Sequence, residues 1–278
     1  MDFVSIHTWI TTLVRKAMPE LPDVEVFRQH AEKHAMNKTI RGVAYNDAGK
    51  LLKSPEQTIS RALKGQKFTR SSRTGKHMFL KTGEDRWLAM HFGMTGYLKY
   101  WKDTDKRSDF SKVIIGFEEG SNLSFVSKRK LGEMKITDDP EDYRRENGLG
   151  MDALDIPFSE FRKSLEDKRG SIKNVLMDQS RVSGIGNIYS DEILFQEKWH
   201  PKQRFEKLDE EALRSLHKTI HRVLKTAINR DARPSDLPAN YLLPNREEGK
   251  KCPACEGKIS KIKINGRGVY FCPDCQKL

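Results

Sequence analysis

The segment around Pro19 combines the residue types of a nucleophile and of an acid–base catalyst. It reads Met18-Pro19-Glu20-Leu21-Pro22-Asp23-Val24-Glu25. If Met18 were the first residue and were removed, Pro19 would carry a free secondary amine, which can attack an electrophilic carbon. The neighbouring carboxylate of Glu20 could then move protons during the reaction. The segment therefore predicts covalent catalysis by a terminal amine.

The seventeen residues before Met18 decide whether this chemistry is available. While residues 1–17 (MDFVSIHTWITTLVRKA) are attached, the nitrogen of Pro19 is part of a planar amide and is not nucleophilic. The segment lacks the basic start, long apolar core and cleavage site of a secretory signal. An organelle-targeting peptide is the alternative, which Asp2 and the single arginine disfavour. We expect an upstream extension from a misassigned start codon, absent from the mature enzyme.

All four cysteines lie near the end of the chain, in two CxxC pairs. The pairs are Cys252-Pro-Ala-Cys255 and Cys272-Pro-Asp-Cys275, and sixteen residues separate them. Two such turns can present four thiolates to a tetrahedral zinc ion. Two disulfides or a redox motif are the alternatives. A reducing compartment disfavours disulfides, and a redox motif would not need two copies, so we expect one structural Zn²⁺.

The residues between the two cysteine pairs predict a β-hairpin. Residues 259–264 alternate between apolar and polar side chains, and an apolar segment follows at 269–271. Asn265-Gly266 between them is the typical signal of a type I′ turn. Arg267 at the hairpin tip is suited to contact a phosphate group. The alternative is an ordinary solvated arginine.

The composition indicates a polyanionic partner. The chain has 278 residues, a net charge of +12, a pI of about 9.4 and a mean hydropathy of -0.71. Seven basic residues and no acidic residue lie between positions 61 and 81, and Lys128-Arg129-Lys130 forms a second cluster. Such a balance favours nucleic acid, although a basic protein without that partner remains the alternative. No apolar run approaches the roughly 20 residues of a membrane helix.

Residue patterns divide the chain into a β-rich and a helical part. Apolar spacing predicts a helix over residues 22–36, and a long apolar stripe predicts another over 208–227. Short strands with glycine-rich turns indicate an antiparallel sandwich or barrel in residues 38–136. Examples of the expected strands are residues 39–45, 77–81, 86–91, 112–117 and 122–126. Residues 231–244 contain three prolines and predict a loop.

The helical part contains a glycine turn followed by a polar residue, Gly184-Ile-Gly-Asn187. Glycines before a helix start can expose backbone N–H groups to an anion, which the helix dipole also favours. Asn187 adds a side-chain donor. Although many such turns are only tight connections, the positive charge of the chain favours a phosphate contact here.

These motifs, taken in order, resemble the bacterial formamidopyrimidine-DNA glycosylase / endonuclease VIII family. The resemblance covers residues 18–278. Besides the segment at Pro19, the glycine turn and the cysteine pairs, it rests on Arg73-Thr-Gly-Lys76, His91-Phe-Gly-Met94-Thr-Gly96 and Leu176-Met-Asp-Gln179. Any one of these motifs could arise by chance, whereas all of them in this order are highly specific.

The resemblance implies an α+β multidomain fold. It consists of an N-terminal helix with an antiparallel β-sandwich, a helix–two-turn–helix domain, and a C-terminal zinc-finger hairpin. The expected boundaries are 1–17 for the extension, 18–145 for the sandwich, 146–245 for the helical domain and 246–278 for the finger. Damaged double-stranded DNA is the implied partner, and a monomer in the bacterial cytoplasm, associated with the nucleoid through DNA, is expected.

The implied activity is that of a bifunctional DNA glycosylase and AP lyase in base excision repair. Pro19 would form a Schiff base with the sugar, Glu20 would be the general acid–base, and Lys76 would hold a phosphate and assist catalysis. The implied DNA-binding residues are Met94, Arg129, Leu131, Asn187 and Arg267, and the implied metal ligands are Cys252, Cys255, Cys272 and Cys275. Met94, Arg129 and Leu131 would fill the space left by the flipped nucleotide.

Each role has a plainer alternative, and the sequence departs from the family in places. Glu20 could cap its own helix, and Met94 could be a core residue. Asp23 stands where many members have Glu, and Leu131 where many have Phe. The segment 230–252 is shorter than in members that cap 8-oxoguanine with a long loop. Formamidopyrimidines, hydantoins and oxidised pyrimidines are therefore comparable substrates.

Two other functions compete with the enzyme. The first is a noncatalytic DNA-binding relative whose Pro19 is blocked by residues 1–17. The second is a zinc-ribbon RNA-binding protein, for which the Pro19-Glu20 pair would serve no purpose. The enzyme is favoured because Pro19, Glu20 and Lys76 are all present.

Overall fold

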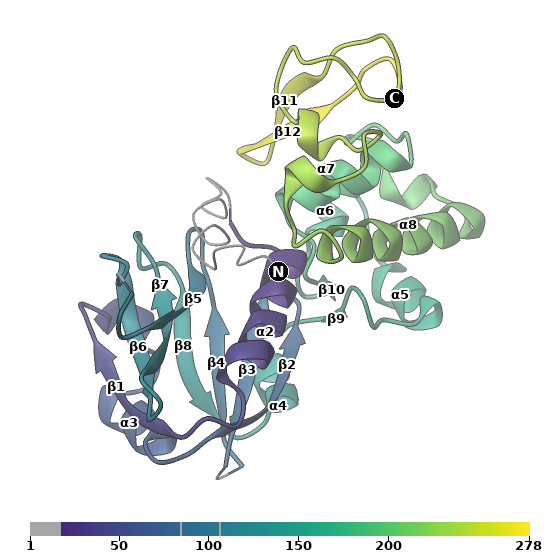
Figure 1. The fold of residues 1–278 in the computed structure, drawn as a ribbon. Coiled ribbons are helices and arrows are strands. Elements are labelled where there is room, and N and C mark those ends of the chain that lie inside the picture. The colour runs from purple at the N-terminus through teal and green to yellow at the C-terminus, as the bar shows by residue number, and fades with distance from the viewer. Residues whose placement is uncertain (1–17, 84, 106) are drawn as a thin grey trace. The chain divides into compact units, whose positions relative to one another are not determined.

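The computed structural model describes residues 18–83, 85–105 and 107–278. The contacts between residues divide the chain into two compact units (Figure 1). Unit 1 contains Asp23–Glu146 together with the described residues 18 and 19, and unit 2 contains Glu20–Pro22 and Asn147–Leu278. None of the helices in the described ranges is long and apolar enough to cross a membrane.

Unit 1 begins with helix α2 (Leu21–Ala35), which agrees with the predicted helix to within one residue. Val24, Phe27, Ala31 and Ala35 recur at helical spacing, and each is almost completely buried in the core of unit 1. The first turn of the helix contributes instead to unit 2, because Leu21 lies in the core of that unit. One helix therefore supplies side chains to two cores.

Two four-stranded antiparallel sheets form the rest of unit 1, in the orders β1-β6-β7-β5 and β2-β3-β4-β8. Apolar side chains from both sheets share one core, so the predicted sandwich is confirmed. The strands are β1 (Ile40–Tyr45), β2 (Phe68–Thr74), β3 (His77–Thr82), β4 (Trp87–His91), β5 (Tyr97–Lys102), β6 (Ser111–Phe117), β7 (Ser121–Val126) and β8 (Glu133–Thr137).

The five expected strands correspond to β1, β3, β4, β6 and β7, whereas β2, β5 and β8 were not predicted. Strand β2 reads FTRSSRT and lies at a sheet edge, so its polar side chains give no alternating apolar signal. Helices α3 (Glu56–Leu63) and α4 (Pro140–Glu146) complete the unit, with the short 3₁₀ helix η1 (Gly49–Leu51).

Unit 2 is a helical core followed by a hairpin. Helix α8 (Glu210–Ile228) carries the predicted apolar stripe, whose residues Leu216, Ile220, Val223 and Ala227 are buried. Its N-cap, Asp209, accepts a hydrogen bond from the N–H of Ala212 at 2.8 Å. The other helices are α5 (Phe158–Leu165), α6 (Ile172–Leu176) and α7 (Asn187–Gln196), with the short parallel strands β9 (Met151–Asp152) and β10 (Val182–Ser183).

The connection between the helices and the hairpin is more ordered than the predicted loop. It contains the 3₁₀ helices η3 (Pro234–Asp236) and η4 (Leu243–Asn245). A third 3₁₀ helix, η2 (Phe205–Lys207), lies outside the connection, just before α8. Within the connection, Tyr241, Leu242 and Leu243 are buried. Two of the three prolines lie within η3 and η4, and apolar residues of the connection pack into the cores of unit 2.

The predicted hairpin is confirmed as strands β11 (Ser260–Ile264) and β12 (Arg267–Phe271). Asn265 and Gly266 both have positive φ angles, 48° and 74°, as a type I′ turn requires. Arg267 is exposed as the first residue of β12 and pairs with Ile264.

A partly buried histidine pair lies in the sheet of unit 1. His77 on β3 and His91 on β4 are register partners whose ring centroids are 4.7 Å apart. Nδ1 of His77 lies 3.2 Å from the hydroxyl of Tyr143 on α4. Burial, together with the charges of His91 and Lys76, lowers the pKa of His77 to about 3. The imidazole is therefore neutral in the folded protein at neutral pH.

This depressed pKa predicts acid sensitivity. An unfolded histidine binds a proton near pH 6.5, whereas His77 resists protonation in the fold until about pH 3. Stability is therefore complete above the unfolded pKa and falls as the pH drops below it. Between pH 6.5 and pH 5, His77 should account for about 2 kcal/mol of lost unfolding free energy. Urea unfolding at several pH values, compared with that of His77→Gln, measures this, and identical pH dependences would contradict it.

Candidate functional site

The carboxylate of Glu20 is held at the N-terminus of α7. Its Oε2 accepts hydrogen bonds from the N–H groups of Gly186 at 2.9 Å and Tyr189 at 3.1 Å, and its Oε1 accepts one from Ile188 at 2.8 Å. The side chain is almost completely buried in this position. It satisfies N–H groups that the helix itself leaves without partners, and the positive end of the helix dipole stabilises the negative charge.

The glycine turn before α7 has two features that allow Glu20 to reach this helix: the backbone of Gly184 and the side chain of Gln179. Gly184 has a φ of +116°, and a Cβ there would lie 2.4 Å from Cδ1 of Leu21, so a side chain would displace the start of α2. The N–H of Leu21 donates to the carbonyl of Gly184 at 3.1 Å. Gln179 braces the same turn, because its Oε1 accepts from the N–H of Gly184 and its Nε2 donates to the carbonyl of Ile185.

This arrangement corrects one expectation from the sequence and answers one alternative. Three N–H groups at the glycine turn and helix start were expected to be available to a phosphate, but they donate to Glu20. Glu20 also does not merely cap its own helix, because these three contacts cap α7. No local pattern indicates this pairing, because Glu20 and Gly186 lie 166 positions apart in the sequence.

The side chain of Asn187, the first residue of α7, reaches the hairpin. Its Nδ2 donates to the carbonyl of Gly268 at 3.0 Å, and its Oδ1 is buried without a hydrogen-bond partner among the described residues. Gly268 directly follows Arg267, whose side chain is exposed. Unit 2 therefore brings together two of the predicted DNA-binding residues, one from α7 and one from the hairpin.

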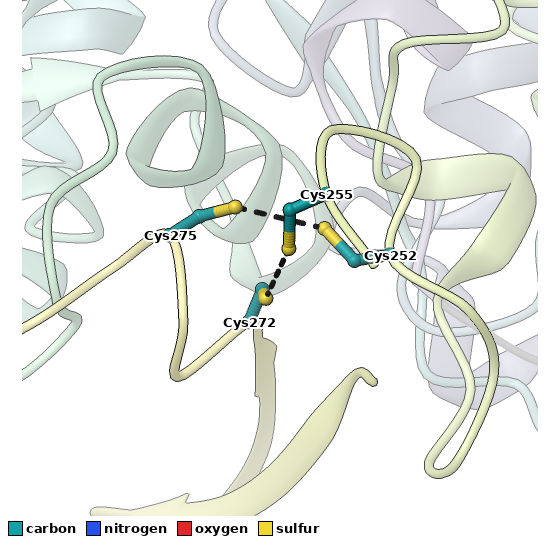
Figure 2. Close-up of side chains that lie close together, drawn as sticks. All are labelled: Cys252, Cys255, Cys272 and Cys275. Atoms are coloured by element: carbon teal, nitrogen blue, oxygen red, sulfur yellow. Dashed lines mark hydrogen bonds between the residues drawn. The ribbon is translucent and has the colours of Figure 1, made fainter. Parts of the chain in front are cut away.

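The four cysteines converge at the other end of the hairpin, as Figure 2 shows. All four Sγ atoms lie within 4.8 Å of one another, with 3.8 Å between Cys252 and Cys275 and 3.5 Å between Cys255 and Cys272. A tetrahedral zinc ion with Zn–S bonds of about 2.3 Å needs S–S separations near 3.8 Å. The residues present therefore fit a four-thiolate zinc ion.

Backbone contacts support the same arrangement of thiolates. The N–H of Ala254 lies 3.4 Å from Sγ of Cys252, and the N–H of Gly257 lies 3.3 Å from Sγ of Cys255. Such donors stabilise charged thiolates. None of the four cysteines is in a disulfide.

In unit 1, Lys76 lies in the turn between β2 and β3 and is mostly buried. Its charge lowers the pKa of both His77 and His91, after burial, which is the larger cause. Gly75 before it has a φ of +57°, and Nη1 of Arg73 donates to the carbonyl of Gly75 at 3.0 Å. The glycine and Arg73 thus shape the turn that presents Lys76.

Arg73 is itself held by Glu25 on α2. Its Nε donates to Oε2 of Glu25 at 3.0 Å, and Nη2 of Arg28 donates to Oε1 at 2.7 Å. Burial alone would raise the pKa of Glu25, but the hydrogen bonds and charges of the two arginines outweigh burial and hold it below its usual value. Glu25 therefore positions the turn of Lys76 rather than lying on an open helix surface.

The three predicted void-filling residues lie on two adjoining loops. Gly93 precedes Met94 and has a φ of +59°, and a Cβ there would lie 2.4 Å from the carbonyl carbon and oxygen of Leu131. The loop after β4 therefore contacts the loop after β7. Leu131 is 49% exposed, Arg129 is exposed and Met94 is half-buried. Unit 1 therefore places the loops that carry these three residues next to each other.

Two groups of functional interest were not predicted from the sequence. His91 begins the motif that ends at Gly96, but nothing in this motif indicates that its ring would stack on His77. The buried set of Lys173, Asp191 and Arg246 joins α6, α7 and the segment after η4. Its members are too far apart in the sequence for a spacing rule to connect them.

Profiles of three known domains match the chain. The formamidopyrimidine-DNA glycosylase N-terminal domain matches residues 18–134, and the formamidopyrimidine-DNA glycosylase H2TH domain matches residues 149–237. A zinc finger found in FPG and IleRS matches residues 249–278. These segments include the turn of Lys76, the start of α7 and the four cysteines.

Whole proteins match over nearly the full chain. Formamidopyrimidine-DNA glycosylase of Arabidopsis thaliana is 32% identical over 94% of this chain and 71% of its own length. The protein of that name from Pelotomaculum thermopropionicum is also 32% identical, over 94% of this chain and 100% of its own. Lactococcus lactis Fpg in complex with DNA containing an abasic site is similar in structure, with a TM-score of 0.83, 28% identity, and coverage of 94% and 100%.

The contacts of Glu20 predict that Glu20→Gln destabilises unit 2. The amide keeps one acceptor oxygen, but its NH₂ group must face one or more of the N–H donors, and the negative charge at the helix start is lost. The unfolding free energy should fall by about 2 kcal/mol. Thermal or urea unfolding measures the loss. The exposed Glu211→Gln at the start of α8 is the matched control, and equal stability of the two variants would contradict the anchoring role.

Proposed function

Because the chain belongs to the formamidopyrimidine-DNA glycosylase family, we propose that it removes oxidised bases from DNA and also acts as an AP lyase. Its identity as a DNA glycosylase of base excision repair follows from matches over nearly the whole chain. The proposal of AP lyase activity is supported chiefly by one observation. The carboxylate of Glu20, the residue bonded to Pro19, is held in place by three backbone N–H groups.

In the proposed reaction, the amine of Pro19 attacks C1′ of the damaged nucleoside. The C1′–N bond to the base breaks as the C1′–N bond to Pro19 forms, and opening of the sugar ring gives an iminium ion. A terminal α-amine suits this role because its pKa, about 7.7–8.0 in model compounds, leaves part of it unprotonated at neutral pH. The attack requires a free Pro19, so residues 1–17 and Met18 must all be absent from the active form.

Glu20 serves this reaction as a charged group held in place. Its carboxylate can accept the proton that leaves the amine, return it to the ring oxygen as the sugar opens, and stabilise the positive iminium ion. The iminium ion acidifies the proton on C2′. Loss of that proton breaks the C3′–O bond by β-elimination, and a second, δ-elimination then breaks the C5′–O bond.

The DNA-binding residues divide into two kinds. Lys76, Asn187 and Arg267 are proposed to contact phosphates around the lesion and so help turn the target nucleotide out of the helix. Met94, Arg129 and Leu131 are proposed to fill the vacated space, which their adjoining loops and exposure support. Leu131 is smaller than an aromatic residue, so stacking on the opposite base is weaker.

The substrate class follows the relatives, which are named for formamidopyrimidine lesions. We propose formamidopyrimidines as substrates, with 8-oxoguanine, hydantoins and oxidised pyrimidines as further candidate substrates. The noncatalytic DNA-binding alternative is not favoured, because the nucleophile, the fixed carboxylate and Lys76 are all present.

The nucleophile assignment predicts a covalent adduct that depends on the N-terminus. Borohydride reduces an iminium ion, so a chain beginning at Pro19 should become covalently attached to DNA with an abasic site. The chain that keeps residues 1–17 should give at least about 100-fold less adduct, because its Pro19 nitrogen is an amide. Intact mass spectrometry confirms both N-termini and the adduct.

A Pro19→Gly variant beginning at residue 19 is the control, since it keeps a terminal amine and should retain some trapping. Equal trapping by the long chain with its N-terminus verified would show that another amine is the nucleophile. Tight DNA binding without trapping by the Pro19 form would favour the noncatalytic alternative.

The cysteine cluster is proposed to hold one zinc ion per chain, with a structural role. Bound zinc cross-links the two turns and so stabilises the finger. Cys272→Ser should lose the ion and weaken binding to damaged DNA by about tenfold or more, because Arg267 lies on the hairpin that the site supports. Metal analysis and a binding titration measure the two effects, with Ser260→Ala, a partly exposed position on β11, as control. Unchanged DNA binding after verified zinc loss would contradict the role.

A further inference from the structure

A single buried carboxylate on α7 holds the hairpin against that helix. Asp191 is completely buried, and its Oδ1 accepts from Nζ of Lys173 at 2.6 Å. Its Oδ2 accepts from Nε of Arg246 at 2.9 Å and from the backbone N–H of Tyr270 at 3.1 Å. One side chain therefore joins α6, α7, the segment after η4 and β12.

Arg246 extends this contact to the residue that follows Arg267. Its Nη2 lies 2.7 Å from Oδ2 of Asp191 and 3.4 Å from the carbonyl oxygen of Gly268. Its guanidinium also lies 4.5 Å from the centre of the Tyr270 ring. The planar fork of an arginine suits such a shared contact, which a lysine cannot reproduce.

The carbonyl of Gly268 is also the acceptor for Asn187. Nδ2 of Asn187 donates to it at 3.0 Å, so the same oxygen receives donors from α7 and from Arg246. Gly268 directly follows Arg267 in β12. The separation between Asn187 and the backbone of Arg267 is thus set by contacts that depend on Arg246 and Asp191.

We propose that Asp191 and Arg246 are positioning residues that make Asn187 and Arg267 act as one phosphate clamp. The inference rests on the proposed function, because the ligand is DNA. Neither residue needs to touch DNA: Asp191 is completely buried, and Arg246 directs its Nε and Nη2 donors into the protein. Without them the hairpin keeps its zinc site and its turn but loses its fixed orientation on α7.

Arg246 is the better residue to change. Replacing Asp191 would leave Lys173 as an unpaired charge in a site that is 1% exposed, and unfolding could then obscure the effect. Arg246→Met removes the fork but keeps an apolar chain over Tyr270. Arg246→Lys keeps the positive charge but loses the planar fork. It therefore tests whether the geometry of the contacts with Asp191 and Gly268 matters beyond the charge.

The experiment measures binding to a duplex with a tetrahydrofuran abasic analogue over a range of salt concentrations. Arg267→Ala should weaken binding about tenfold and reduce the slope of log Kd against log salt by about one, as loss of one phosphate contact does. Arg246→Met should produce the same two changes, and the double variant should be no worse than either single variant. Arg246→Lys should weaken binding similarly despite its charge.

Lys250→Met is the matched control. Lys250 lies on the same segment, is exposed, and pairs with Glu247 at 3.2 Å, so its replacement removes the same charge without touching Asp191. Its Kd should stay within about twofold of the unchanged chain. Zinc content and unfolding midpoints of all variants confirm that the finger remains folded.

The outcomes separate this inference from the proposed function. Three results would each overturn the positioning role of Arg246: unchanged binding in Arg246→Met, full retention of binding in Arg246→Lys, or additive losses when Arg246→Met is combined with Arg267→Ala. Additive losses would mean that Arg246 contacts DNA itself. Normal lesion-DNA binding by the chain that begins at Pro19, without borohydride trapping, would instead overturn the AP lyase proposal and leave the binding test intact.

Discussion

The contact between the Glu20 carboxylate and the N-terminus of α7 is the constraint on which the site in unit 2 depends. Three backbone N–H groups hold the carboxylate, and its buried position leaves it little freedom to move. Pro19 is bonded to this residue, so the proposed nucleophile cannot move far from it. The same helix start carries Asn187, and the next turn carries Asp191. The proposed chemistry at Pro19, the proposed phosphate contact of Asn187 and the orientation of the hairpin therefore all depend on one short helix.

Local sequence signals predicted the parts of the fold that local physics determines. The Asn265-Gly266 turn, the two CxxC pairs and the apolar stripe of α8 each depend on residues close in the chain, and each is found in the structure. The family resemblance and the fold class are likewise confirmed. Strand β2 escaped prediction because an edge strand can be polar, so pairing with β3 rather than an apolar pattern defines it.

Contacts between distant segments could not be predicted in this way. The sequence offered Glu20 as a catalyst or as a cap of its own helix, whereas its partners begin at Gly186. The Asp191–Arg246 pair is 55 positions apart and has no motif. Such pairs depend on how whole elements pack, and a charge that is exposed in the unfolded chain gives no sign that folding will bury it. The roles assigned to the site residues stay predictions, because they depend on contacts with a second molecule, DNA, rather than on contacts within the chain.

A chain with a net charge of +12 nevertheless buries three carboxylates at α7: Glu20, Asp191 and Glu192. Burial raises the pKa of Glu192 to about 7 even though it accepts hydrogen bonds from the N–H groups of Leu242 and Leu243. Buried carboxylates of this kind add little net stability over apolar residues, because desolvation offsets much of their attraction, whereas replacing one alone leaves its buried donors without an acceptor. Their contribution is geometric: each accepts hydrogen bonds from several donors and so ties its own segment to one that is distant in the sequence. Buried acids can thus orient the basic and polar groups that are proposed to contact DNA, while the surface keeps a positive charge that attracts a polyanion.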